Sequence, residues 1–148
     1  MANPDSVNSN TQDYFGNYRL IRSAQAVSFG ATGNAVVALP ILSGGTGNTT
    51  QYILRRITVA NLTNSAGGAA PNAATANISI GYTNDGANLV VSAQTLANLT
   101  GAGTYNDLTL ATLATTNSFT ANALFVNINT SVANAQAYIA VYGDIVTF

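Results

Sequence analysis

Hydrophobic and polar residues alternate along much of the chain from about residue 19 onward. The clearest run covers residues 76–83, in which Ala, Ile, Ile and Tyr alternate with Asn, Ser, Gly and Thr. Because successive side chains of a strand point to opposite faces, this period of two predicts a half-buried β-strand. The same alternation predicts long strands over residues 52–62, 124–129 and 137–148. Shorter strands are expected over residues 18–22, 26–29, 35–39, 89–93 and 104–110.

Two of the long strands carry expectations about which residues share a face. In the strand over residues 52–62, we expect Ile53, Ile57 and Val59 to point to one side. In the last strand, one face is aliphatic and the other carries Tyr138 and Tyr142. Both faces of the last strand are therefore expected to be covered.

Glycine and asparagine clusters separate the predicted strands, and long helical patterns do not alternate with them. Residues 66–76 read as an exposed loop, and residues 87–99 as a strand followed by a turn or a short helix. A chain of 148 residues suits one domain. The pattern predicts an all-β fold, a single antiparallel β-sandwich over residues 19–148. With about eight or nine strands, a jelly roll is the leading architecture.

Residues 1–18 form a distinct polar segment rich in Asn, Ser, Thr and Gln, with Val7, Tyr14 and Phe15 as apolar interruptions. A polar terminus orders only where something holds it in place. We therefore predict an extended N-terminal arm that lies against a partner or another subunit. Packing of the arm on its own domain is the alternative.

Charge changes this picture most, because only 6% of the residues are charged, against about 25% in typical soluble domains. Histidine, cysteine, tryptophan, lysine and glutamate are absent, so most general bases, thiol nucleophiles and soft metal ligands are missing. We expect no enzyme activity and no cofactor. The aspartates outside the arm are better explained by local structure than by a catalytic pair: Asp85 fits a hairpin turn, Asp107 a strand start and Asp144 a bulge. Asn84, Asp85 and Asn88 offer a weak alternative as calcium ligands.

Partners and compartment follow from the same composition. Four arginines and a pI near 4.7 cannot form a broad phosphate-binding face, so nucleic-acid binding is not expected. No apolar run approaches the roughly 18 residues of a membrane span, and the first residues lack the pattern of a signal peptide. Synthesis and assembly in a cytosol are expected. A net charge of -1 also favours association with neighbouring molecules.

The arginines are the most distinctive side chains of this neutral surface. Arg55 and Arg56 are adjacent on a predicted strand, so we expect them to point to opposite faces. Arg19 and Arg22 lie where the arm meets the body. Arginine pairs bidentately with carboxylates, and tyrosine and arginine are enriched in interfaces. The candidate interface residues are Tyr14, Phe15, Tyr18, Arg19, Arg22, Arg55 and Arg56, with solvated or internally paired arginines as the alternative.

Three segments carry a resemblance to a known class of proteins: the Asn/Ser/Thr-rich start through residues 14–18, the strand over residues 52–59 and the terminal strand over residues 138–146. Together they resemble capsid decoration (cement) proteins and head-fibre proteins of tailed bacteriophages. The resemblance implies a β-sandwich or jelly roll, a homo-oligomer with a trimer favoured, and a virion location. It also implies binding to the major capsid protein on the outer capsid surface, with no catalytic residues.

Two other functions stay open at this point. One is a host-surface adhesion module, for which Tyr82 and Tyr105 are the candidate aromatic contacts. The other is a principal coat or tail subunit, which is expected to assemble by itself into shells or tubes.

Overall fold

The computed structural model describes residues 18–38, 50–118, 120 and 123–147. Residues 1–17 of the predicted arm, with Tyr14 and Phe15, lie outside the described residues. The described part contains eight strands and one short helix. In chain order these are β1 (Tyr18–Ser28), β2 (Gly33–Ala38), β3 (Thr50–Asn64), β4 (Asn77–Gly81), β5 (Leu89–Thr95), β6 (Tyr105–Leu108), α1 (Thr112–Thr116), β7 (Ala123–Thr130) and β8 (Ala135–Thr147).

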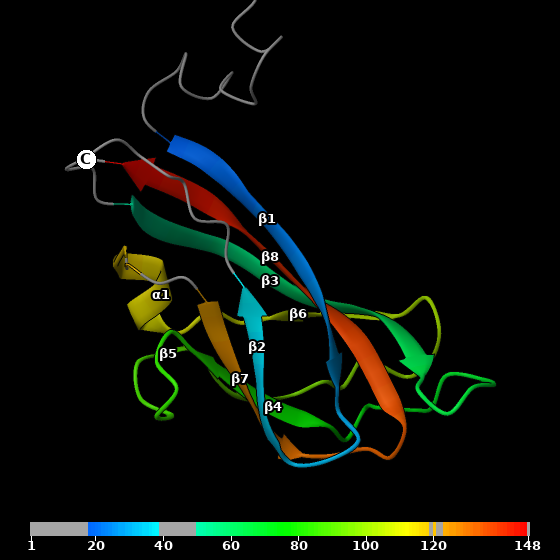
Figure 1. Ribbon diagram of the computed structural model, residues 1–148. Helices are drawn as coiled ribbons and strands as arrows, with labels where there is room; N and C mark the ends of the chain where they lie inside the picture. Colours follow the sequence, from blue (N-terminus) through cyan, green and yellow to red (C-terminus); the bar gives the residue numbers. More distant parts are fainter. Residues whose placement is uncertain (1–17, 39–49, 119, 121–122, 148) are drawn as a thin grey trace, which may run out of the picture.

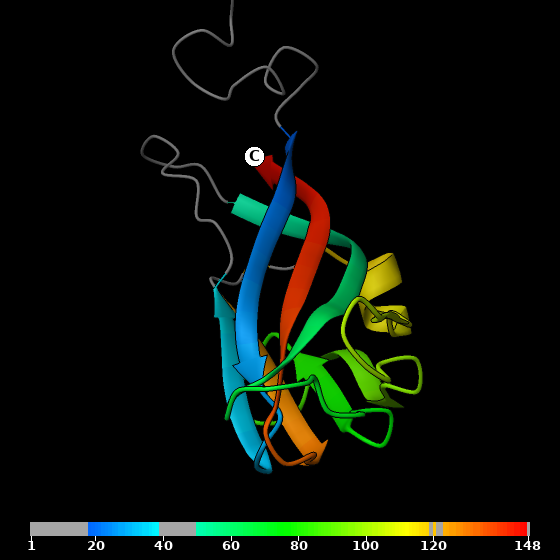
Figure 2. The same ribbon diagram turned by 90° about the vertical axis from the view of Figure 1, so that its right-hand side faces the viewer.

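The strands form two four-stranded antiparallel sheets that pack face to face (Figures 1 and 2). One sheet has the order β1-β8-β3-β6 and the other has the order β2-β7-β4-β5. The predicted all-β antiparallel sandwich is therefore confirmed. The finer assignment as a jelly roll stays a prediction.

The pairing of the strands is nested. The first strand pairs with the last, β2 pairs with β7, β3 pairs with β6, and β4 pairs with β5. The turn between β4 and β5 joins neighbours within one sheet, whereas the other links between consecutive strands cross from one sheet to the other. The last strand also pairs with β3, so β8 lies inside its sheet, as Figure 1 shows.

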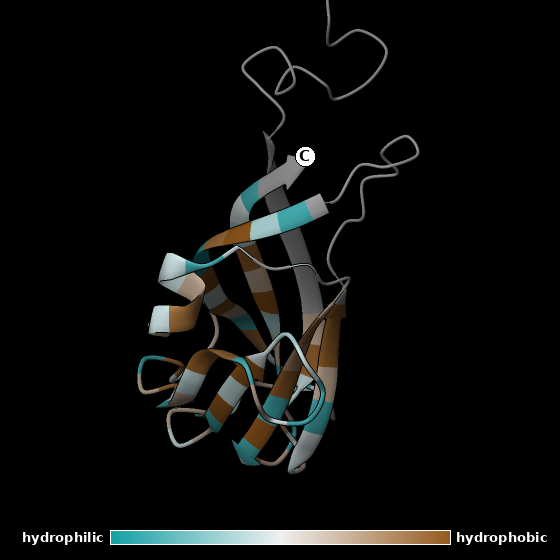
Figure 3. Cartoon of the chain, turned by 90° about the vertical axis from the view of Figure 1, so that its left-hand side faces the viewer, coloured by the Kyte–Doolittle hydropathy of each residue, from teal (hydrophilic) through white to brown (hydrophobic). Residues whose placement is uncertain are grey.

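The core lies between the two sheets and takes its side chains from alternate positions of the strands. Bands of hydrophobic and hydrophilic residues alternate along the strands in Figure 3. Phe29, Ile57, Leu124 and Ile139 have no measurable exposure, and Val27 is also buried. Burial of such side chains contributes about 1.5–3 kcal/mol each, so this shared interior holds the sheets together.

Several local predictions change in detail. The two short strands expected over residues 18–22 and 26–29 are one continuous strand, β1, because both halves pair with β8 in a single register. Residues 87–99 form strand β5 followed by a turn, in which the Leu99 amide donates to the Leu96 carbonyl at 2.8 Å. Helix α1 was not expected, and it packs against β5 and β3.

The long strand β3 has a β-bulge near its middle. Leu54 pairs with Gly143 and Arg56 pairs with Tyr142, so Arg55 is an extra residue with no counterpart on β8. A bulge of this kind shifts the inward face of a strand by one position. A second shift follows between Ala60 and Thr63.

The buried positions of β3 record both shifts. The buried hydrophobic side chains are Tyr52 and Leu54, then Ile57 and Val59, then Leu62. The prediction that Ile53 shares a face with Ile57 and Val59 is therefore wrong. Ile53 is only half-buried, because it lies before the first bulge, between the inward-facing Tyr52 and Leu54, and therefore points to the outer face.

Candidate functional site

The bulge in β3 places two adjacent arginines on the same outer face of the β1-β8-β3-β6 sheet. The Arg55 side chain is 64% exposed and the Arg56 side chain is 53% exposed. The prediction that they point to opposite faces is therefore wrong, because it assumed a regular strand. Gly143 lies opposite the bulge, and a Cβ atom there would clash with the carbonyl oxygen of Ile53. A glycine at this position thus permits the close approach of β8 to β3.

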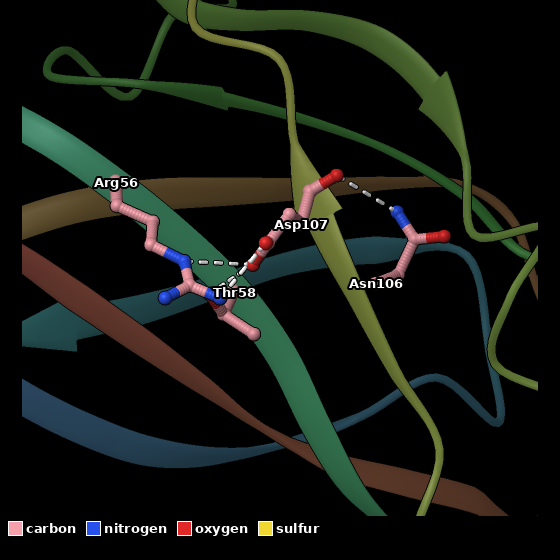
Figure 4. A network of polar contacts seen from close by, with 4 residues as sticks. All are labelled: Arg56, Thr58, Asn106 and Asp107. Carbon is pink, nitrogen blue, oxygen red and sulfur yellow. Dashed lines mark hydrogen bonds and ion pairs between the residues drawn. The ribbon is translucent and has the colours of Figure 1, made fainter.

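Each arginine is held by an aspartate on a neighbouring strand. Nε of Arg55 donates to Oδ2 of Asp144 at 2.9 Å, and Nη2 lies 2.7 Å from the same oxygen. Arg56 makes a bidentate pair with Asp107, at 2.9 Å from Nε to Oδ1 and 2.8 Å from Nη2 to Oδ2 (Figure 4). Internal pairing, the alternative left open by the sequence, therefore applies to both arginines. Both guanidinium groups are well exposed, although the Asp144 side chain is only 17% exposed, and pairs near the surface contribute only about 0–1 kcal/mol to stability.

Asp107 is the best-connected acid of this face. The Thr58 hydroxyl donates to its Oδ1 at 2.5 Å. This hydrogen bond, followed by those from Arg56 and the positive charge of Arg56, lowers the pKa of Asp107 below its usual value. The neighbouring side chain of Asn106 points inward and is 4% exposed. Its Oδ1 accepts from the Asn98 amide at 3.1 Å, which anchors β6 to the loop after β5.

Three tyrosines accompany these ion pairs on the same face. Tyr105, Tyr138 and Tyr142 are 56%, 43% and 38% exposed. Ala60 is the register partner of Tyr105 on one side and of Tyr138 on the other, and Arg56 is the partner of Tyr142. Within the part of the chain that the structure describes, the expectation that both faces of the last strand are covered is wrong, because Tyr138 and Tyr142 are exposed.

Two shallow hollows adjoin Tyr105. The first has a volume of about 340 Å³. The second has a volume of about 500 Å³ and shares Gly103, Thr104 and Tyr105 with the first. Arg56 and Tyr142 line only the first hollow, and Asp107 lines only the second. Tyr105 therefore stands between two recesses that carry different polar groups.

The structure places the other predicted interface residues by strand register. Tyr18 pairs with Val146, Arg19 with Ile145 and Arg22 with Tyr142. Arg22, Tyr142 and Arg56 thus occupy one row across β1, β8 and β3. All four predicted arginines thus belong to the β1-β8-β3-β6 sheet, Arg19 and Arg22 on β1 and Arg55 and Arg56 on β3.

This surface also contains three residues outside the predicted interface set, namely Tyr138, Tyr142 and Asp107. Their signal was present in the sequence, since both tyrosines alternate with the buried Ile139 and Val141 of β8. What the sequence did not show is that none of the residues described by the structure covers that face of the sheet.

The loop between β4 and β5 has the turn chemistry that the sequence predicted. The Thr83 hydroxyl and the Ala87 amide donate to Oδ1 of Asp85 at 2.6 and 3.0 Å. These two bonds, that of Thr83 first, lower the pKa of Asp85. Gly86 and Asn88 have positive φ angles of 74° and 51°. Among the described residues, no group of three or more metal-ligating acids, histidines or cysteines occurs.

Comparison with known proteins adds no identification. A scan against protein-family models, a search of curated proteins and a search of solved structures each found no significant match. Within the part of the chain that the structure describes, no helix has the length and hydropathy needed to cross a membrane.

Proposed function

We propose that this chain is a virion structural protein without enzyme activity, most specifically a capsid decoration protein. In this role it binds the major capsid protein on the outer surface of the shell and stabilises the assembled particle. One observation carries the proposal: the charged side chains that the structure describes are almost all paired, while one sheet presents exposed tyrosine and arginine side chains.

The charged side chains that the structure describes are few, and most neutralise one another. Four of them form the pairs Arg55–Asp144 and Arg56–Asp107. The fifth, Asp85, accepts hydrogen bonds within its own turn. A surface with so little net repulsion favours association. Tyrosine and arginine are the residue types that carry most binding energy in protein interfaces.

The topology gives independent support of a more general kind. Nested pairing of eight strands into two four-stranded sheets is what results when an antiparallel ribbon is rolled up, and we propose that the sandwich is a jelly roll. Viral capsid domains and lectins both use jelly rolls. A fold does not specify a function, so the topology supports the proposal without carrying it.

We place the capsid contact at the end of the β1-β8-β3-β6 sheet that leads into the arm. Tyr18 pairs with Val146 there, and Thr50 pairs with Thr147, so three strands meet at this end (Figure 1). The start of β1, with Tyr18, Arg19 and Arg22, then forms one contact region with the arm that precedes it. A homo-oligomer, with a trimer favoured, would repeat this contact. Binding only to assembled shells stabilises them by mass action.

The test uses particles produced without this protein, to which the purified full chain is added. We expect saturable binding, measured as copies per particle by gel densitometry, and a higher temperature of particle disruption. Removal of residues 1–17 or the substitution Arg22→Ala should lower occupancy, while Asp85→Asn in the loop between β4 and β5 serves as a control with wild-type occupancy. Thermal unfolding of each variant checks that the domain is intact.

Two results would contradict the proposal. Absence of binding to particles at any protein concentration would remove the decoration role. Spontaneous assembly of the purified chain into shells or tubes would instead identify a principal coat or tail subunit. Sedimentation velocity on the purified chain tests the trimer separately.

A further inference from the structure

We propose that the two hollows beside Tyr105 form a binding site for an uncharged saccharide. This inference does not rest on the capsid role, because Gly103, Thr104 and Tyr105, which line both hollows, lie on β6 and the turn before it, whereas β1 forms the opposite edge of the sheet.

Tyr105 provides the aromatic surface that saccharide binding requires. Its side chain is 56% exposed, although a tyrosine ring gains free energy by leaving water. The axial C–H groups of a pyranose form an apolar patch that packs on such a ring, and the phenol hydroxyl remains available for a hydrogen bond. A ring standing between two recesses can contact one sugar residue on each side.

The wall that carries Tyr105 is ordered before any ligand binds. The Thr104 hydroxyl donates to the Gly101 carbonyl at 2.6 Å and accepts from the Gly101 amide at 3.3 Å, which closes the turn over residues 101–104. Gly103 has a positive φ of 78° within this turn. Asn106, which follows Tyr105 in β6, is buried and accepts a hydrogen bond from the Asn98 amide, so it holds this part of the strand in place. Such preorganisation reduces the entropy lost on binding.

The polar groups of the hollows match hydroxyl groups. Asp107 occupies two of the five N–H groups of the Arg56 guanidinium, so the others can donate to a ligand in the first hollow. One guanidinium nitrogen points away from Asp107 in Figure 4. In the second hollow, the Asp107 carboxylate retains acceptor capacity beyond Arg56 and Thr58. A sugar hydroxyl donates and accepts, so it can use both groups.

Charge balance selects an uncharged ligand. The Arg56 and Asp107 charges cancel at 2.8 Å, so neither sign of ligand charge gains a net attraction. An anionic sugar would have to separate Arg56 from Asp107. The volumes of about 340 and 500 Å³ fall within the range of about 300–1,000 Å³ typical of small-molecule sites. Because the hollows are open and adjoin, a short oligosaccharide lying across Tyr105 suits them better than a single sugar.

The experiment is a titration of the isotope-labelled full chain with glucose, galactose, mannose and their disaccharides, followed by NMR. We expect shifts concentrated at Asn61, Gly103 and Thr104 and a larger response to disaccharides. Tyr105→Ala should weaken binding by about tenfold or more. Tyr138→Ala is the matched control, an exposed tyrosine on the same sheet outside both hollows, and should bind like wild type. Binding should not change with salt, since no net charge is involved.

A second variant keeps the test decisive if Tyr105→Ala unfolds. Arg56→Lys replaces the planar donor group at an exposed position and should also weaken binding, while Tyr105→Phe should retain most of it. The proposal is overturned if no neutral sugar shifts the residues of the hollows, or if Tyr105→Ala and Arg56→Lys both bind like wild type. A preference for sialylated sugars, or a strong dependence of binding on salt, would overturn the proposal that the ligand is uncharged. Wild-type capsid occupancy of Tyr105→Ala would separate the two functions.

Discussion

Deletion of Arg55 tests whether the bulge in β3 is the reason that two adjacent arginines share one face. Removing this residue leaves Leu54 opposite Gly143 and Arg56 opposite Tyr142, so the pairing with β8 is preserved. Leu54, Arg56 and Ile57 then follow a regular alternation of inward, outward and inward positions. We therefore expect a folded protein in which the only direct loss is the exposed pair between Arg55 and Asp144.

The expected magnitudes differ clearly between this deletion and a matched control. Loss of an exposed ion pair lowers the free energy of unfolding by about 0–1 kcal/mol. Deletion of Thr58 from the same strand removes a residue where no bulge exists, so Ile57 and Val59 become adjacent and only one can face the core. Val59 has no measurable exposure, and its loss from the core costs about 1.5–3 kcal/mol or more. The hydrogen bond to Asp107 is lost as well.

Urea unfolding followed by far-UV circular dichroism measures the difference. With a slope of about 2 kcal/mol per molar urea, deletion of Arg55 should move the midpoint by about 0.5 M at most, and deletion of Thr58 by about 1 M or more. The bulge interpretation fails if the deletion of Arg55 destabilises the protein as much as the deletion of Thr58, because the strand would then have relied on Arg55 for its alternation.

Three further predictions concern the core and the acids. Gly143→Ala should lower the free energy of unfolding by about 1–3 kcal/mol in urea titrations, since its Cβ would clash with the carbonyl of Ile53 and strands β8 and β3 would have to separate. Phe29→Ala should cost about 3–5 kcal/mol, because Phe29 is fully buried between the sheets. A smaller loss would show that the core collapses around the cavity. Asp107 has a lowered pKa, so its stabilising effect is present above the unfolded value of about 3.9 and is lost as the pH falls through the folded value. Stability measured from pH 7 downward should therefore decline less steeply below about pH 4 in Asp107→Asn than in wild type.

The strand positions and the sandwich could be predicted from the sequence because period-two alternation and turn residues are local signals. The strand order could not be predicted from local signals, because paired strands such as β1 and β8, or β2 and β7, are separated by most of the sequence. Helix α1 also gave no signal. It spans five residues, lacks a side-chain cap and has no acidic residue in its first turn. Its Ala114 is buried, so tertiary packing rather than helix propensity accounts for it.

The candidate surface could be predicted only in part, and the reason lies in β3. Tyr52 and Leu54 occupy even positions, whereas Ile57 and Val59 occupy odd ones. All four can face the core only if the strand has an extra residue between them, where the two arginines lie. Ile53 offers a competing assignment with no bulge at all. The choice depends on a glycine at the facing position of β8, and the sequence alone does not reveal which residue faces which.

The nested pairing of the strands sets the order in which the chain can close its loops during folding. The turn between β4 and β5 joins strands separated by a few residues, whereas β1 and β8 meet only when nearly the whole intervening chain has been folded back. The entropic cost of closing a loop rises with the number of residues in it. The pair β4–β5 is therefore the least costly nucleus, and the pair β1–β8 closes last. Measured φ-values should then be higher for conservative truncations at Ile80 and Val91 than at Val27 and Ile139. A chain built in this way folds slowly, and its first and last strands remain open to other molecules longest.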